Sequence, residues 1–293
     1  MKKFFLITII ILTYLSNKAF TQNNYPDYKK HEFSVWVAGG AASLKYGSEI
    51  ISKGGSFGGM YGLGYSFYLN DRFGLGTGVE LAYYNATVTI DKINEQYTVN
   101  ADNSLEAFDF RSSILNYKEK QFARYLNIPI MAQYQQVVGK NRFYGAAGIK
   151  IGLPMNTEYE TEIGEVTNSA YYHATRLEDS ETAELGLGRF YNRSNKEKFD
   201  FSTAYSISLE FGAKWNLSKK FYLYTLFFLD YGLNNVNNDK NSPEQLVNYN
   251  SSNPQDFSYG SVLYSSYADD NSPKRFAEKV NPMAVGIKIK IGF

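Results

Sequence analysis

The sequence predicts an all-β protein, an eight-stranded antiparallel up-and-down transmembrane β-barrel with long extracellular loops. Three observations predict it. Residues alternate with a period of two in eight segments, as they do in strands with two unlike faces. The connections between these segments are alternately short and long. The face opposite the large apolar residues is mostly Gly, Ala and Ser with a few charges, which is typical of a barrel interior and not of a soluble sandwich.

The first four strands are each predicted from local alternation. Residues 33–46 follow this pattern, and residues 57–69 set Phe, Tyr and Leu against Gly and Ser. Asn70–Asp71 is a turn signal, after which residues 73–84 restart the pattern with Phe, Leu, Val and Tyr against Gly, Glu and Ala. Residues 121–136 alternate in the same way and form the fourth strand.

The last four strands follow the same logic. The expected strand at 142–155 is rich in glycine and alanine, and 221–234 is rich in aromatic residues. The clearest alternation is at 205–217, where large apolar residues alternate with Ser, Glu, Gly, Lys and Asn. The final strand, 283–293, sets Met, Val, Ile and Phe against Gly and Lys.

The connections differ in length on the two sides of the predicted barrel. Tight turns are expected at 70–71, 138–141 and 218–220, and longer connections at 47–55, 89–120, 156–200 and 235–280. Outer-membrane barrels place short turns in the periplasm and long loops outside the cell. Partial alternation persists at 86–99 and 105–115, so we expect the second and third hairpins to extend above the membrane as sheet.

Charged residues on the small-residue face should point into the barrel. Charges in such an interior are tolerated when they are paired, so we predict a network that fills the lumen. We expect Lys150 to meet Glu210 or the surroundings of Lys214, and Asp230 to meet Lys288. A conducting path is the alternative, but eight strands leave little room for solutes. The predicted lumen residues are Glu80, Lys150, Glu210, Lys214, Asp230, Lys288 and Lys290.

The amino terminus has the features of an export signal. Lys2 and Lys3 precede an apolar stretch that ends at Leu15, and the small-residue pattern Ala19–Phe20–Thr21 follows. The apolar run is too short to span a membrane as a helix. We therefore predict a cleaved signal peptide at 1–21 and a single barrel domain at 22–293.

Composition excludes several classes of function. The chain has 30 Lys and Arg residues against 29 Asp and Glu residues, so it has no excess of positive charge for binding nucleic acid. It contains no cysteine, which excludes disulfides and thiol chemistry. We expect no cofactor and no metal site. Oxygen-rich segments at 237–239 and 269–271 are the candidates for calcium, but they lack the ligand spacing of a dedicated loop. The 26 Tyr and 21 Phe are expected mainly in aromatic girdles at the membrane interfaces.

Three segments resemble a known family. Residues 124–131, which include Leu126–Asn127–Ile128–Pro129, resemble a strand motif of the "porin family" outer-membrane barrels of Bacteroidetes, a group that includes PorT-like proteins. Residues 145–148 and 289–293 are also similar. Asn127 departs from the family, which usually has an acidic residue there. The resemblance implies an integral outer-membrane protein in contact with lipid and lipopolysaccharide, with Phe293 as a signal for the barrel-assembly machinery.

The sequence leaves three kinds of function open. The favoured one is a non-enzymatic structural or surface-interaction protein that binds an extracellular protein or glycan through its loops. The acidic loop 156–200 and the aromatic residues of loop 235–280 are candidate surfaces. A small pore is the alternative. A barrel enzyme acting on lipid A or peptides is less favoured, because His31 and His173 lie outside the predicted strands. The loop aromatics are Tyr249, Phe257, Tyr259, Tyr264 and Tyr267.

Overall fold

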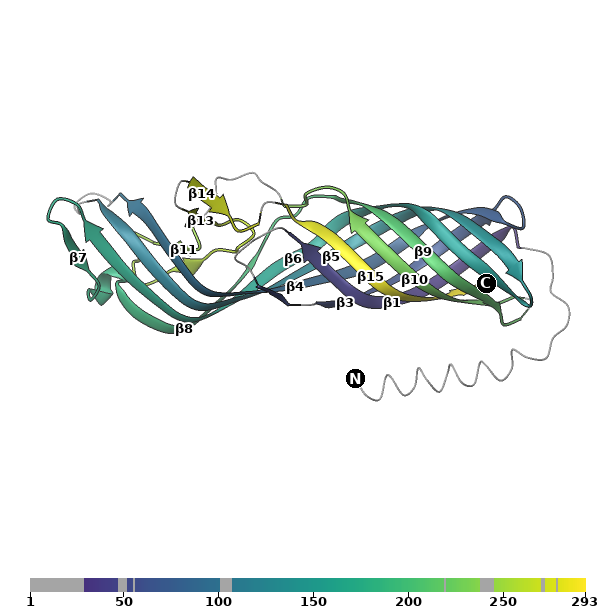
Figure 1. The fold of residues 1–293 in the computed structure, drawn as a ribbon, viewed down its shortest axis with the longest axis horizontal. Helices are drawn as coiled ribbons and strands as arrows, with labels where there is room; N and C mark the ends of the chain where they lie inside the picture. The colour runs from purple at the N-terminus through teal and green to yellow at the C-terminus, as the bar shows by residue number, and fades with distance from the viewer. Residues whose placement is uncertain are drawn as a thin grey trace.

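The structure separates a closed barrel from a long open sheet. The computed structural model describes residues 29–46, 52–54, 56–100, 107–218, 220–237, 245–269, 272–277 and 279–293. Figure 1 shows the barrel at one end of an elongated molecule and the open sheet at the other. The predicted signal peptide at 1–21 lies outside the described residues and stays a prediction.

Eight strands form the barrel, and each pairs antiparallel with its two neighbours in chain order. The pairing of the first strand with the last closes the ring. The predicted eight-stranded up-and-down barrel is therefore confirmed. The strands are β1 (His31–Lys45), β3 (Phe57–Tyr68), β4 (Phe73–Val99), β5 (Phe108–Val138), β6 (Asn141–Tyr172), β9 (Ala204–Asn216), β10 (Tyr222–Gly232) and β15 (Asn281–Gly292).

Three of these strands are much longer than the sequence predicts. β4, β5 and β6 leave the ring and continue together, and β8 (Gly188–Lys198) pairs with the far part of β6. We call this open sheet the extension. It comprises β4 from Tyr83 onward, β5 up to Ala123, β6 from Asn156 onward and β8. The barrel and the extension are thus one continuous sheet in which only the first part is closed.

A kink across the extension explains why its strands were only partly recognised. On β4, Ile90 and Ile93 are both buried and the two residues between them are exposed, so the alternation changes phase. Asn116 on β5 lies at the same level with φ 55°, a left-handed conformation that Asn tolerates better than most residues. Gly164 on β6 continues the kink. A search for strict period two loses the signal at this level.

The outside of the barrel is an apolar wall. Val37, Leu63 and Ile287 are 60%, 59% and 56% exposed, which a water-soluble protein would avoid over a whole sheet face. Aromatic side chains lie outward near both ends of the wall. Those near the extension include Tyr61, Tyr83, Tyr205 and Tyr231, and those near the tight turns include Phe33, Phe73, Tyr134, Phe143, Phe221 and Phe293.

The last long connection spans residues 233–280, and we call it loop four. Its described parts, 233–237, 245–269, 272–277 and 279–280, fold back on the inner face of the extension. Its apolar side chains join those of β4, β5 and β6 in one buried cluster. Within the described residues, no helix has the length and apolar character needed to cross a membrane. The remaining short elements are β2 (Ser52–Gly54), β7 (Leu177–Asp179), the 3-10 turn Ala183–Leu185, β11 (Val247–Asn248), β12 (Ser258–Tyr259), β13 (Ser266–Asp269) and β14 (Ser272–Arg275).

Candidate functional site

Glycines of β3 make room for an indole ring in the lumen. A Cβ added to Gly62 would lie 2.5 Å from Cζ2 of Trp36, and one added to Gly64 would lie 2.6 Å from Cζ3. The Trp36 Nε1–H donates a hydrogen bond of 2.9 Å to Oε2 of Glu80. The alternating glycines therefore have a packing role, and the ring that they admit holds a buried carboxylate in place.

Glu80 is the centre of the lumen network. Its side chain is 0% exposed, and Lys150 Nζ lies 2.8 Å from Oε1. Asn127 Nδ2 donates to the same oxygen at 3.1 Å, and Lys288 Nζ lies 3.5 Å from Oε2. Asn127 thus acts as a neutral donor at the position where the resembled family usually has an acid.

The ion pairs differ from those that we expected. Lys150 pairs with Asp230 at 2.7 Å as well as with Glu80, and Lys288 pairs with Glu210 at 2.5 Å. The expected pairs fail because of strand register. Glu210 lies opposite a β6 residue four positions before Lys150, and Lys288 lies opposite a β10 residue four positions before Asp230. The observed ion pairs join strands that are not neighbours in the ring.

The sequence reasoning missed Glu32, a lumen carboxylate near the tight turns. Lys214 Nζ lies 2.7 Å from its Oε2, and the Tyr224 hydroxyl donates to its Oε1. With Glu32 included, four lysines face four carboxylates in the lumen. A signal was available, because Glu32 shares its parity with Ser34 and Trp36, which also face inward.

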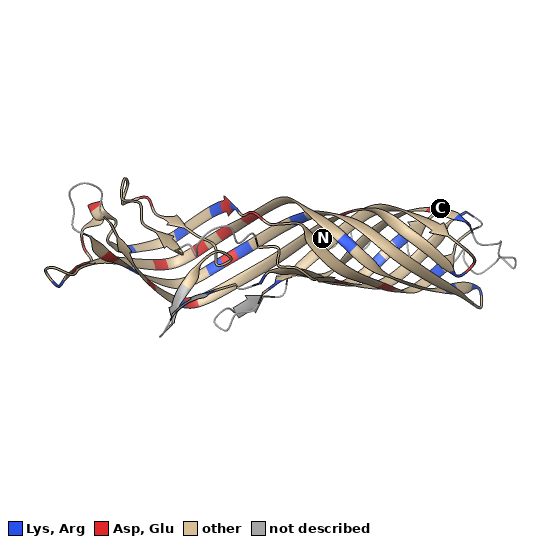
Figure 2. Ribbon diagram, turned by 90° about the horizontal axis from the view of Figure 1, so that it is seen from above, with Lys and Arg blue, Asp and Glu red and all other residues tan. Residues whose placement is uncertain are grey.

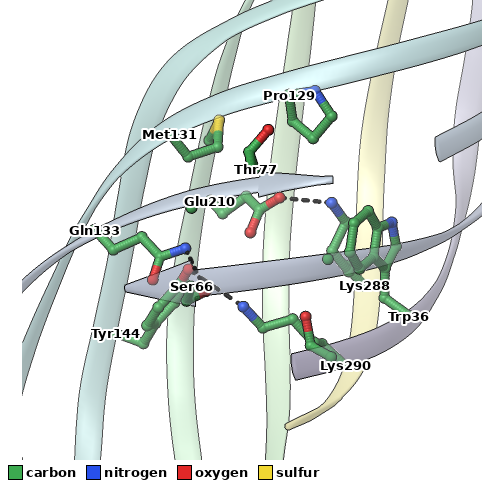
Figure 3. A pocket seen from close by; sticks show the side chains of 13 residues that line it. Trp36, Ser66, Thr77, Pro129, Met131, Gln133, Tyr144, Glu210, Lys288 and Lys290 are labelled. Atoms are coloured by element: carbon green, nitrogen blue, oxygen red, sulfur yellow. Dashed lines mark hydrogen bonds and ion pairs between the residues drawn. The ribbon is translucent and has the colours of Figure 1, made fainter. Parts of the chain in front are cut away.

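Aromatic rings close the lumen near the tight turns. Lys290 Nζ lies 4.2 Å from the centre of the Tyr224 ring and 3.4 Å from the Tyr144 hydroxyl. Both tyrosines and Tyr68 are buried. A cavity of about 30 Å³ remains beside Lys290 and Glu210, as Figure 3 shows, and it has room for one or two water molecules.

A second set of buried carboxylates lies in the extension and anchors loop four. Glu95 of β4 accepts the backbone N–H groups of Leu246 at 2.7 Å and Val247 at 3.0 Å. Burial raises the pKa of Glu95 to about 7, and these two hydrogen bonds only partly oppose the increase. The Tyr97 hydroxyl adds a bond of 2.8 Å to the Val247 carbonyl. Loop four is thus held at this point through its own backbone N–H and carbonyl groups, so these hydrogen bonds do not depend on the side chains of the loop.

Glu119 of β5 repeats this arrangement closer to the barrel. It accepts the Ser261 hydroxyl at 2.7 Å and the Val262 N–H at 2.9 Å. Tyr117 and Gln121 donate to the same carboxylate at 2.5 Å and 2.6 Å. Burial raises the pKa of Glu119, and the four donors act in the opposite direction. Two separate points of loop four are therefore fixed to two strands of the extension.

The loop-four aromatics face inward, which corrects their interpretation as a binding surface. The ring of Tyr249 lies 5.0 Å from a phenylalanine ring of β5, and that of Phe257 lies 5.3 Å from one of β8. Tyr259 is 4% exposed, and the Tyr264 hydroxyl accepts a backbone N–H bond of 2.9 Å. The side chain of Tyr267 lies outside the described part of the structure. These rings pack loop four onto the extension.

The two histidines lie far apart and form no nucleophile–base pair. His31 is the first residue of β1, not a residue before it, and its Nδ1 lies 2.6 Å from the Tyr65 hydroxyl. His173 follows β6 directly at the far end of the extension, where its Nε2 lies 2.8 Å from Oδ2 of Asp109. Among the described residues, neither histidine bonds a serine or threonine hydroxyl. Within the described residues, neither histidine is therefore placed to activate a hydroxyl nucleophile.

The outward face of the extension carries cross-strand ion pairs. Glu162 of β6 pairs with Lys120 at 2.6 Å and Lys118 at 3.2 Å, both on β5. On the other side of β6, Glu158 pairs with Lys196 of β8 at 3.1 Å. Figure 2 shows acidic and basic positions interspersed along this sheet. The acidity that the sequence assigns to loop 156–200 is therefore partly neutralised by adjacent strands.

The remaining candidates have structural roles or lie partly outside the described residues. The Phe293 N–H donates to the Phe33 carbonyl at 2.8 Å and the reverse bond is 3.0 Å, so this residue completes the ring; its part in assembly stays a prediction. The candidate calcium segments 237–239 and 269–271 are only partly described. In the described residues, no group of three or more His, Asp or Glu is placed to hold a metal ion.

Comparison with known proteins gives one family match and several similar structures. A family model described as outer membrane protein beta-barrel domain matches residues 20–238. None of the curated proteins matches the chain. OprG from Pseudomonas aeruginosa is similar over 92% of this chain and 98% of its own, with 11% identity and a TM-score of 0.34.

Two structures of Ail, the attachment invasion locus protein of Yersinia pestis, are also similar. Each is covered over 100% of its length by 90% of this chain. The complex of Ail with the heparin analogue sucrose octasulfate has 10% identity and a TM-score of 0.26. The other has 8% identity and a TM-score of 0.27. Scores this low give no functional information about this chain.

Proposed function

The chain belongs to the outer membrane protein β-barrel domain family, and from that membership we propose that it is a non-enzymatic surface-interaction protein. The barrel anchors it in the outer membrane, in contact with lipid and lipopolysaccharide. The extension, braced by loop four, is the part that meets an extracellular protein or glycan. The short turns face the periplasm in this arrangement.

One observation carries the proposal: a large part of the chain forms a braced sheet beyond the barrel, and the lumen is filled. β5 has 31 residues and β6 has 32, against 12 in β3. Two buried carboxylates and an apolar cluster fix loop four on the inner face. A pre-organised sheet loses little conformational entropy on binding, so it suits a recognition surface.

The lumen and the histidines favour this proposal over the alternatives. A pore needs a continuous path, whereas charged side chains and three buried tyrosines occupy the lumen, and the cavity beside Lys290 and Glu210 measures about 30 Å³. An enzyme needs a base within reach of a nucleophile, and His173 instead bonds Asp109. The outward face of the extension is then a pre-organised surface that remains available for function.

Single-cysteine labelling in intact cells tests which end of the molecule lies outside the cell, because the natural sequence contains no cysteine. We expect Ser113→Cys, on the outward face of β5, to react with a membrane-impermeant maleimide. The matched variant Ser218→Cys, in a tight turn, should react only after the outer membrane is permeabilised. The reverse pattern would contradict the proposed orientation.

A photo-activated crosslinker on the same cysteine tests recognition. Ser113→Cys should give a discrete protein or glycan adduct on intact cells of the native organism. Leu63→Cys, on the lipid-facing wall, is the control and should give lipid adducts only. If Ser113→Cys and two further outward positions, Asn94→Cys and Ser194→Cys, gave no discrete adduct, the surface-interaction function would be wrong.

A further inference from the structure

Among the described residues, basic side chains outnumber acidic ones at the end of the barrel that bears the tight turns. Three tight turns and the segment before β1 each contribute at least one cation. Asp71 is the exposed carboxylate among the described side chains at this end. Figure 2 shows basic positions at turns on this end of the molecule. We call this set the turn-end cations: Lys29, Lys30, Arg72, Lys140, Arg142 and Lys220.

These cations differ in pairing from those of the extension. Lys118, Lys120 and Lys196 each lie within 4.0 Å of a carboxylate across a strand. At the turn end, Arg72 Nε lies 4.0 Å from Oδ2 of the adjacent Asp71, whereas Lys30 and Lys140 form no ion pair with a described carboxylate. An excess of cations at one end of the molecule favours binding of an external anion.

The turn-end cations are combined with exposed aromatic side chains in a repeated pattern. At each of the three tight-turn hairpins, a basic residue directly precedes an outward phenylalanine at or near the start of the returning strand: Arg72–Phe73, Arg142–Phe143 and Lys220–Phe221. Outward aromatic rings lie at the level where acyl chains meet headgroups. The adjacent cation then lies at the level of the phosphates, where each Lys or Arg favours anionic lipid.

We propose that the turn-end cations bind anionic phospholipid headgroups in the leaflet of the outer membrane that faces the periplasm. Charge complementarity selects this occupant, because the belt of rings places the cations at the depth of lipid phosphate. The inference rests on the orientation proposed above. Its test uses purified protein and lipid, so its failure would leave the cysteine-labelling result untouched.

Trp215 is a natural reporter for this site. Its ring is 39% exposed on the outer wall near the end of β9, and its Nε1 donates to Thr225 at 2.9 Å. The next residue, Asn216, donates to the Lys140 carbonyl at 3.2 Å, and Lys29 Nζ donates to the Lys220 carbonyl at 2.7 Å. Trp215 therefore lies on the outer wall at the turn end, one residue from a contact with the turn that carries Lys140. The sequence has 2 Trp residues, and the second one, Trp36, is buried in the lumen.

The experiment measures quenching of Trp215 by brominated lipids. The full mature chain is folded into phosphatidylcholine vesicles that contain increasing shares of dibrominated phosphatidylglycerol or dibrominated phosphatidylcholine. Trp215→Phe gives the background from the lumen tryptophan. We expect an apparent association constant about fivefold higher for phosphatidylglycerol at low salt. The ratio of the two association constants should fall toward one at about 1 M salt, where the Debye length is roughly 3 Å.

Two variants with equal loss of charge locate the effect. Lys140→Gln with Lys220→Gln should abolish the preference, whereas Lys196→Gln with Lys198→Gln, at the other end of the molecule, should leave it intact. Heat-modifiable migration on gels checks that each variant is folded, and the salt titration of the natural chain does not depend on any variant. Equal quenching by both lipids, or a preference that survives in the first variant or at high salt, would overturn the proposal.

Discussion

Glu80 illustrates how individual residues make the closed barrel possible. A carboxylate with 0% exposure requires compensation, and it has two lysines, an amide and an indole N–H. The same logic applies to Glu32, which Lys214 and Tyr224 satisfy. Glu80 and Glu32 are therefore each tied to partners from other strands, and removal of one partner leaves a buried charge behind.

Lys150 provides the sharpest test of this coupling. Lys150→Met removes the cation shared by Glu80 and Asp230, and we expect a loss of about 3–5 kcal/mol in the free energy of unfolding. Adding Asp230→Asn should recover part of that loss. Urea unfolding in detergent micelles, followed by tryptophan fluorescence, measures both. A cost under about 1 kcal/mol for the single variant would contradict the network.

The contact between Trp36 and its glycines can be tested with one methyl group. Gly64→Ala places a Cβ 2.6 Å from the indole, and we expect a loss of about 1–3 kcal/mol. Trp36→Leu should remove most of that sensitivity. Gly59→Ala is the matched control, because its Cβ would have only one neighbour, at 3.7 Å. Equal effects at the two glycines, measured by the same urea titration, would refute this packing.

At the scale of elements, the extension depends on loop four. A free open sheet of four strands would expose Val88, Ile114 and Val166 to water, and loop four buries them. The anchoring bonds join residues more than 140 positions apart in the chain. Loop four and the extension therefore fold as one unit, and the protonation state of its buried carboxylates affects how firmly the two are joined.

Loop four should be held more firmly in acid than in alkali. Burial raises the pKa of Glu95 from 4.5 to about 7, so proton uptake accompanies the seating of the loop. The free energy that proton uptake by Glu95 contributes to holding loop four is about 3 kcal/mol at most. It is complete below about pH 4.5 and is lost as the pH rises through 7.

Hydrogen exchange at the amide of Val247 measures this effect. After correction for intrinsic exchange, protection should fall about tenfold between pH 6 and pH 8. Glu95→Gln keeps an uncharged acceptor and should remove that fall. Glu160→Gln, on the outward face, is the matched control and should behave as the natural chain. An unchanged pH dependence in Glu95→Gln would show that another group is responsible.

The sequence was informative where periodicity was strict and weak where contacts were remote. The barrel could be predicted because glycine and aromatic alternation is local to each strand. The extension was only partly recognised, because the phase changes at Asp91 and Asn116. The pairing of Lys150 could not be predicted, since the register between strands and the width of the lumen decide it. The position of Tyr259 depends on loop four as a whole.

At the scale of the whole molecule, the structure has two unlike parts, the barrel and the extension. The barrel supplies an apolar wall with aromatic belts and a filled interior, and the extension supplies a braced polar sheet. The turn-end cations give the opposite end a different charge character. The lumen holds four buried lysines and four buried carboxylates, which is the basis for the proposal that the molecule acts through its outside.

Single-channel recording in planar lipid bilayers tests the closed lumen most directly. The folded state of the sample is first established by heat-modifiable migration, so that silence cannot be due to unfolded protein. With paired charges and a cavity of about 30 Å³, the natural chain should give no discrete current steps. Reproducible single-channel steps from the folded protein would contradict the closed lumen and would favour a transport function.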